Sequence, residues 1–276
     1  MNVVWGVLVV AGVTAATIGA MLFVRRRAPE GGYFADGDRA AGVFGVLATG
    51  FSVLLGFIVF LAFASYDQSR SGAETEALMV LQQAETAQFF PEPTSSKLTG
   101  DLACYARSVI HGEWSQMEHG TLGDQVNPWG IELFRTLHPY EPKTASQQSA
   151  YDKWLDQTSQ REEARLDRVH GAVGVIPTSL WIVLFFIAAV IFVFTLRFAD
   201  SGERAFSQAL LMGSVTSVIA ALFLLLTALD KPFHTGVGGL KPVAMERTLR
   251  LADQAFTALG TSVTPPCDST GRPLAR

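Results

Sequence analysis

Hydrophobic residues along this chain are gathered into four long runs, separated by polar stretches that keep a helical spacing. A helix needs about 20 apolar residues to cross a bilayer. Four runs meet that length: residues 3–24, 42–65, 174–198 and 206–229. No cation precedes the first run and Arg25, Arg26 and Arg27 follow it directly, which is not the layout of a secretory signal peptide. The pattern predicts an all-α, polytopic membrane protein with four transmembrane helices.

The second run continues without a Gly-Pro break into a polar segment. Leu78, Leu81, Ala84 and Gln88 recur there at steps of three and four residues, and Pro91 ends the segment. The pattern predicts one long helix that crosses the membrane and projects beyond it.

Residues 66–173 are too numerous for a simple loop, and we expect them to form a helical extramembrane insert. Its first helix has the predicted buried positions Leu98, Leu102, Tyr105, Val109 and Trp114. A longer helix begins near Thr144, with the predicted buried positions Tyr151, Trp154, Leu155, Thr158, Leu166 and Val169. This helix is expected to pair with the projection of the second span as an antiparallel stalk and to run on toward the third span.

The pattern therefore divides the chain into four parts. Residues 1–65 hold the first two spans, 66–173 the insert, and 174–229 the last two spans. Residues 230–276 begin with a turn rich in Pro and Gly. A helix from about Pro242 should then lie back on the stalk, and a flexible tail should follow it.

Composition narrows the class of protein. Charged residues make up 17% of the chain, below the roughly 25% usual for soluble domains. The net charge of −4 gives no general affinity for nucleic acid. The two cysteines, Cys104 and Cys267, exclude an all-cysteine metal site. Both lie on the same side of the membrane, where they would pair as a disulfide if that side is oxidising; two free thiols are the alternative.

Catalytic and transport chemistry has few candidates in this sequence. None of the four runs contains Asp, Glu, Lys or His, which argues against a pump or a secondary transporter. His111, Glu113 and His119 could be imagined as a metal cluster, but solvated polar groups are the favoured interpretation. We predict no catalytic residues, no metal site and no cofactor.

Two spans carry candidate pore residues. Thr49, Val53 and Phe57 lie four residues apart on one face of the second span. They would form a hydrophobic constriction that opens when water enters it, or else they make ordinary helix-packing contacts. In the fourth span, Ser214 and Ser217 are candidates for pore lining or for helix packing.

The charges beside the spans give a divided answer on orientation. The arginines after the first run place the first loop in the cytoplasm, and the insert and C-terminus outside. Cations before the third span and after the fourth favour the opposite: Arg161, Arg165, Arg168, Lys231 and Lys241. We expect a multi-pass protein of a bacterial plasma membrane, with the insert and the C-terminus extracytoplasmic.

Three stretches carry a family resemblance that covers the chain from about residue 33. They are GFSVLLGFIVFLAFASYDQSR, CYARSVIHGEW with MEHG after it, and DKPFHTGVGGLKPVAMERTL. The chain resembles the bestrophin-like bacterial membrane proteins, a family named as a domain of unknown function. The first and last stretches are also similar to the neck helix of bestrophins proper and to the segment after their last span.

The resemblance implies a pentameric anion channel whose second span lines a neck at Thr49, Val53 and Phe57. Two of these are not the bulky residues expected in such a neck. Residues 235–239 offer no carboxylate ligands for the calcium clasp of animal bestrophins, so calcium gating is not expected. The resemblance also implies cytoplasmic termini, against the charges that follow the first span.

Two functions from different classes follow. The leading hypothesis is a bestrophin-like homo-oligomeric ion channel that lies in a lipid bilayer and passes small anions. The alternative is a non-conducting membrane scaffold or sensor whose helical insert binds a protein or envelope partner; a monomer or dimer in detergent would favour it.

Overall fold

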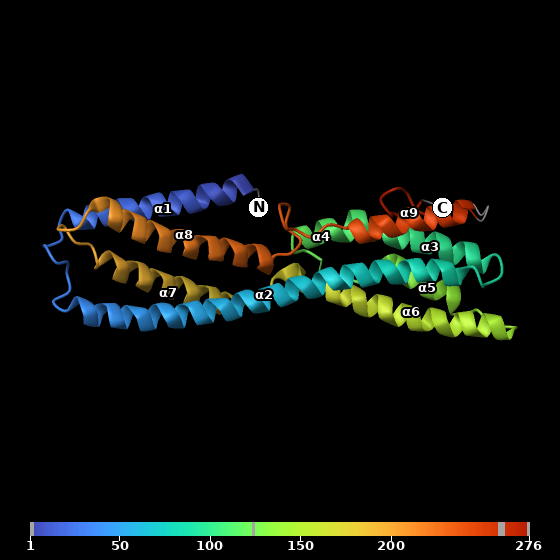
Figure 1. Cartoon of the computed structure of the whole chain (residues 1–276). Helices are drawn as coiled ribbons and strands as arrows, with labels where there is room; N and C mark the ends of the chain where they lie inside the picture. Colours follow the sequence, from blue (N-terminus) through green and yellow to red (C-terminus); the bar gives the residue numbers. More distant parts are fainter. Residues whose placement is uncertain (1–2, 123–124, 259–262, 275–276) are drawn as a thin grey trace. The chain divides into compact units, whose positions relative to one another are not determined.

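A computed structural model describes residues 3–122, 125–258 and 263–274 of the chain (Figure 1). Over these residues the regular structure is helical. The helices are α1 Val3–Arg25, α2 Gly37–Ala87, α3 Thr94–Ser108, a π-helical turn η1 Val109–Glu113, α4 Trp114–Glu118, α5 Pro128–Leu137, α6 Ala145–His170, a 3₁₀ turn η2 Gly171–Val173, α7 Thr178–Leu196, α8 Ala205–Asp230 and α9 Val243–Ala258. Four of them, α1, α2, α7 and α8, are long and apolar enough to cross a membrane, which confirms the four-span, all-α prediction.

The chain forms two compact units, which we describe separately. The spanning unit comprises Met1–Ser65 and Gly174–Gly239, and the insert unit comprises Tyr66–Val173 and Leu240–Arg276. The 51-residue helix α2 contributes its first part to the spanning unit and its second part to the insert unit.

The core of the spanning unit is formed by one face of α2 packed on α7 and α8. Its hydrophobic cluster consists of Phe51, Leu55, Ile58, Ala62, Leu184, Ile191 and Leu226. Rings from α7 and α8 stack beside it, with the centroids of Phe185 and Phe223 4.9 Å apart. Aromatic and branched side chains thus fill this core without any polar partner to satisfy.

Helices α1 and α8 lie side by side in the spanning unit (Figure 1). A Cβ built on Gly213 would lie 3.1 Å from the side chain of Ile18, so the glycine leaves room for that side chain between the two helices. The hydroxyl groups of Thr14 and Ser217 are hydrogen-bonded at 2.8 Å across the same contact. Small residues and one polar bond therefore fix this helix pair.

The helix that precedes the third span does not run on into it. Helix α6 ends at His170 and α7 begins only at Thr178, after Pro177. The backbone N–H groups of Val175 and Ile176 both donate to Asp230 Oδ1, at 2.8 and 2.9 Å. Proline prevents helical geometry in the residue before it, and the aspartate satisfies the backbone groups that the break leaves unpaired.

In the insert unit, α2 and α6 pack antiparallel. Gln68 Nε2 donates to Asp167 Oδ1 and Gln83 Nε2 donates to Thr158 Oγ1, each at 2.8 Å. The two backbones lie close together at Gly72, where an added Cβ would lie 2.5 Å from the backbone nitrogen of Arg168. Helix α9 contacts α2 through Thr248, whose hydroxyl donates to the carbonyl oxygen of Ala77 at 2.9 Å.

The buried face of α6 differs from the predicted one. Trp154 is buried as expected, but Leu155 and Leu166 are exposed at 44% and 67%. The buried long side chains are arginines instead: Arg161, Arg165 and Arg168. The apolar pattern was a poor guide because carboxylates on neighbouring elements make the arginine face the one that packs inward.

The C-terminal tail is ordered over residues 263–274, where the sequence predicted a flexible one. Asp268 Oδ1 accepts from the backbone nitrogens of Thr270 and Arg272 at 2.8 and 2.9 Å, which closes a tight turn. Cys267 and Pro273 form an isolated antiparallel bridge across it. Contacts with α3 and α5, distant in sequence, hold this short polar segment, so local composition did not reveal its order.

Candidate functional site

The three predicted neck residues lie on one face of α2 in the spanning unit, and that face is exposed. Val53 and Phe57 are 54% and 66% exposed, and Thr49 is also exposed. The glycines on this side, Gly45 and Gly56, have no atom within 4 Å of a built Cβ. The face therefore presents small and apolar groups that no other part of the spanning unit covers.

The exposed surface of α7 differs from that of α2 in having no glycine. Its uncovered side chains are bulky: Ile182, Val183, Phe185, Phe186 and Val193. Bulky apolar surface is typical of lipid contact, whereas small residues are enriched where transmembrane helices approach one another. The exposed surface of α2 combines both kinds, since Gly45 and Gly56 are exposed there together with Val46, Phe60 and Phe63.

The two candidate serines of α8 differ in their contacts. Ser217 donates to the carbonyl oxygen of Gly213 at 2.7 Å and is bonded to Thr14 on α1. Ser214 is exposed and donates to the carbonyl oxygen of Leu211 at 2.8 Å. Ser217 takes part in helix packing, while Ser214 bonds back to its own helix.

Cys104 on α3 and Cys267 in the tail form a disulfide that closes a sequence separation of 163 residues. Both residues are buried. Arg107, one turn further along α3, donates from Nη1 to the carbonyl oxygen of Asp268 at 3.2 Å. The bond joins the end of the chain to the first helix after α2.

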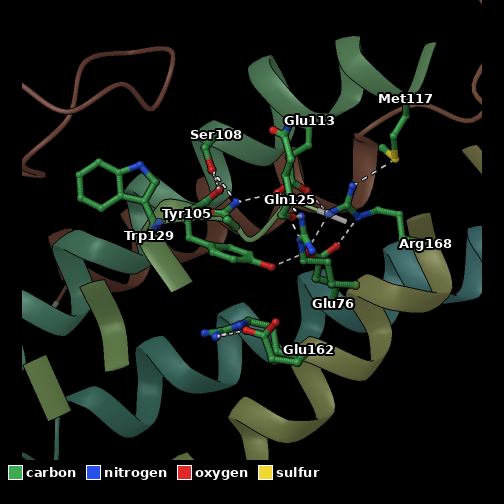
Figure 2. A network of polar contacts seen from close by, with 12 residues as sticks. Glu76, Tyr105, Ser108, Glu113, Met117, Gln125, Trp129, Glu162 and Arg168 are labelled. Carbon is green, nitrogen blue, oxygen red and sulfur yellow. Dashed lines mark hydrogen bonds and ion pairs between the residues drawn. The ribbon is translucent and has the colours of Figure 1, made fainter. Parts of the chain in front are cut away.

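A cluster of buried charges lies inside the insert unit, centred on Arg168 (Figure 2). Its guanidinium forms an ion pair with Glu76 on α2, using Nε and Nη2, and is fully buried, as is Glu76. Nη2 also donates to Glu113 Oε2 at 2.5 Å. Arg165, one turn earlier on α6, donates to Glu113 Oε1 at 2.9 Å. Two carboxylates and two guanidinium groups thus balance in charge.

Neutral groups satisfy the remaining acceptor positions of these carboxylates (Figure 2). Tyr105 Oη donates to Glu76 Oε1 at 2.6 Å, and Asn127 Nδ2 donates to Glu113 Oε1 at 3.0 Å. The π-helical turn η1 ends at Glu113, whose side chain it directs inward next to the buried Trp114. Excellent geometry of this kind is what offsets the cost of removing four charges from water.

Arg161 extends the cluster by one more turn of α6. Its Nη1 donates to Gln83 Oε1 at 2.7 Å, and Nη2 donates to the half-exposed Glu162 at 2.8 Å. Its guanidinium also lies over the ring of Tyr105, 4.9 Å from the centroid. The three arginines at positions i, i+4 and i+7 therefore occupy one helix face, with a partner for each.

The pKa values of Glu113 and Arg168 are shifted in the directions that preserve their charges. Burial alone would raise the pKa of Glu113, but the guanidinium groups of Arg168 and Arg165 outweigh it and lower that pKa. Burial alone would lower the pKa of Arg168, but Glu76 and Glu113 raise it. Burial, and then the charge of Glu76, raise the pKa of Tyr105, which keeps its hydroxyl a donor. Glu113 and Arg168 therefore keep their charges at neutral pH.

This arrangement suits structure better than catalysis or metal binding. Each carboxylate is already bonded to two or more donors. Among the residues that the structure describes, no group of three or more His, Cys, Asp and Glu could hold a metal ion. Glu113, weighed above as a metal ligand with His111 and His119, is instead an ion-pair partner.

A family model for the Bestrophin-like domain matches residues 11–244, most of the chain. The chain belongs to the bestrophin-like family. None of the curated proteins compared with it matches in sequence. Among solved structures, a point variant of a bacterial Bestrophin homolog from Klebsiella pneumoniae is similar, with a TM-score of 0.68 at 12% identity over 90% of this chain and 98% of that one.

A second structure of that homolog from Klebsiella pneumoniae, phased with zinc, has a TM-score of 0.64 at 13% identity, over 95% of this chain and 100% of that one. At such low identity, the likeness shows a bestrophin-like fold and no activity. The family and fold expected from the sequence motifs are confirmed.

The buried charges of this bestrophin-like chain are the residues that sequence reasoning missed. The sequence pattern presents Arg165 and Arg168 as charges beside a span and does not single out Glu76. The signal that could have found them is the spacing of Arg161, Arg165 and Arg168, which puts three cations on one face of a helix. Three aligned cations need carboxylate partners or water, and only the fold decides which.

Proposed function

We propose that the chain is the subunit of a homo-oligomeric, bestrophin-like anion channel with its neck on the exposed α2 face. The observation that carries this proposal is the uncovered, glycine-containing face at Thr49, Val53 and Phe57, opposite the packed core. One helix cannot enclose a pore, so several copies must contribute this face around a common axis. Membership of the bestrophin-like family supports the assembly.

Conduction in this proposal needs no catalytic step. Val53 and Phe57 would narrow the neck with apolar groups, and water would leave such a constriction when it closes. The spans hold no carboxylate, lysine or histidine at membrane depth that could couple transport to protons. Permeation would therefore be passive, and selectivity would depend on the neck and its approaches.

The test is chloride flux from liposomes that contain the purified protein, with empty liposomes as the background. We expect Phe57→Ala and Val53→Ala to change the flux, because both would widen the neck. Phe186→Ala is the matched control, since Phe186 is equally exposed but lies on the bulky α7 surface. Equal flux from all three variants would refute the neck. Absence of flux in several lipids and at several potentials would favour the scaffold or sensor.

We also propose that the insert and the C-terminus lie outside the cytoplasm. The disulfide between Cys104 and Cys267 is stable in oxidising compartments. The insert is long, and the charges of long loops count little in the positive-inside rule. The short loops between the spans then determine the membrane orientation. The loops placed on the cytoplasmic side carry Arg25, Arg26, Arg27, Arg39, Arg197 and Arg204. This orientation is opposite to the cytoplasmic termini that the family resemblance implies.

Labelling of intact cells with a membrane-impermeant maleimide tests this orientation. Ser149→Cys places a thiol at an exposed position of the insert unit, and Ser201→Cys places one in the α7–α8 turn of the spanning unit. We expect only Ser149→Cys to react before the cells are broken. Reaction at Ser201→Cys alone would reverse the assignment.

A further inference from the structure

The ordered tail packs against α3 and α5 through a buried hydrogen bond and a close backbone contact. Trp129 Nε1 donates to the carbonyl oxygen of Gly271 at 2.7 Å, and both residues are buried. Gly271 has φ +81°, and a Cβ added there would lie 2.4 Å from the backbone nitrogen of Ser108. Only glycine fits, because a side chain would be strained and would also collide with α3. The tail is therefore held by specific packing and hydrogen bonding as well as by the disulfide.

The residues beneath the tail also hold the buried charges. Asn127 stands at the start of α5, where its Oδ1 accepts from the backbone nitrogen of Trp129 at 3.0 Å. Its Nδ2 donates to Ser108 Oγ at 2.9 Å and to Glu113 Oε1 at 3.0 Å. Asn127 thus joins two residues that the tail contacts, Ser108 and Trp129, to the carboxylate of Glu113.

From Glu113 the contacts continue to α2 without a break. Glu113 accepts from Arg168, and Arg168 is the ion-pair partner of Glu76. The side chains of Asn127, Glu113, Arg168 and Glu76 are all buried, so water cannot readily replace a lost partner among them. A shift of Asn127 must move Glu113 or leave it short of a donor.

We infer that the tail is a clamp on α2: the disulfide and Gly271 hold Trp129 and Asn127, which hold Glu113 and Arg168 against Glu76. In this chain of contacts Asn127 is the positioning residue. The clamp rests on the proposed function only where it acts on the channel, since α2 is also the helix that carries the proposed neck. Its mechanical part can be measured without any flux.

The experiment is hydrogen exchange of the full-length protein in detergent, comparing Gly271→Ala and Cys267→Ser with the unchanged chain. Ser269→Ala is the matched control, because Ser269 is exposed in the same turn. We expect both tail variants to speed exchange by about tenfold in residues 72–80 of α2 as well as in the tail. Faster exchange confined to the tail and α3 would overturn the clamp, because the tail would then stabilise only the residues that it contacts directly.

A double-variant comparison isolates the role of Asn127. Asn127→Ala removes the link to Glu113 and leaves the cysteines in place. If the tail acts through Asn127, Gly271→Ala adds nothing to exchange in α2 once Asn127→Ala is present. Additive effects of the two changes would contradict the inference.

Flux then separates the two proposals. If the neck proposal holds, Gly271→Ala should change chloride flux several-fold while Ser269→Ala leaves it unchanged. If no variant conducts but exchange in α2 still responds to the tail, the channel fails and the clamp stands. If chloride flux is measurable and exchange is unaffected, the clamp alone is refuted.

Discussion

The two units of this protein bury different kinds of side chain between their helices. The main packed cluster of the spanning unit is apolar, from Phe51 on α2 to Leu226 on α8, and a charged residue buried in that unit, Asp230, lies at the end of α8 and bonds to backbone N–H groups. The insert unit buries Glu76 and Arg168 completely. Between transmembrane helices there is no hydrophobic driving force, because lipid is as apolar as leucine, so shape and small residues select the contacts. In the insert unit, buried charges that each need an oppositely charged partner determine which helices come into contact.

The difference has consequences for tolerance to change. An apolar contact in the spanning unit can be replaced by another apolar group, or by lipid, at a modest cost. A buried ion pair cannot lose one member without leaving the other charge unpaired. We therefore expect the insert unit to be the more sensitive to single substitutions and to pH.

The largest effect is expected at Arg168. Arg168→Met would leave Glu76 and Glu113 buried without their cation, at a cost of about 3–5 kcal/mol in the free energy of unfolding. Arg70→Met is the control, because Arg70 pairs with Glu74 in an exposed i,i+4 pair and should cost under about 0.5 kcal/mol. Thermal unfolding followed by circular dichroism in detergent measures both. Similar losses for the two variants would show that burial of the network is not what stabilises the unit.

A smaller effect is expected where α2 meets α6. Gly72→Ala places a methyl group 2.5 Å from the backbone of Arg168, so the helices must separate, at about 1–3 kcal/mol. Gly50→Ala is the counterpart in the spanning unit, where no atom lies within 4 Å. Because alanine favours a helix more than glycine does, Gly50→Ala should leave the free energy of unfolding unchanged or raise it slightly. The same unfolding measurement distinguishes them, and a harmless Gly72→Ala would contradict the close approach.

The smallest effect concerns pH and Asp101, a carboxyl buried between α3 and α5. Burial raises its pKa to about 6, although a hydrogen bond from Thr136 opposes the rise. A raised pKa means that the folded state is more stable when the Asp101 carboxyl group is protonated and neutral than when it is ionised. This contribution is complete below the ordinary pKa, near 4, and is lost as pH rises through about 6. We expect a loss of about 1–2 kcal/mol between pH 4 and 7, less than the full shift implies because nearby water screens the charge.

Asp101→Asn should remove that dependence, whereas Asp67→Asn, at an exposed position of α2, should not. Unfolding measured at several pH values is the check. Glu113 gives the opposite sign, since its lowered pKa adds stability above its ordinary pKa that is lost only in stronger acid. If Asp101→Asn shows the same pH dependence as the unchanged chain, the assignment to Asp101 is refuted.

The sequence by itself determined the parts of this protein that depend on local pattern. Uninterrupted apolar length fixed the four spans, because a bilayer requires that length whatever the helices pack against. Helical spacing predicted the buried face of α3, with Leu98, Leu102 and Tyr105 among its members. The motifs around the second span and after the fourth identified the bestrophin-like family.

The tertiary structure alone decided which polar residues lie inside. Arg165 and Arg168 look like ordinary charges of an exposed helix until Glu113 and Glu76, distant in sequence, meet them. The tail is ordered for the same reason, since Gly271 finds its place against Ser108 and Trp129 rather than against its own neighbours. Hydrophobic periodicity records what each segment hides from water, but the cost of burying a charge depends on its partner, and partners are chosen only when the chain has folded.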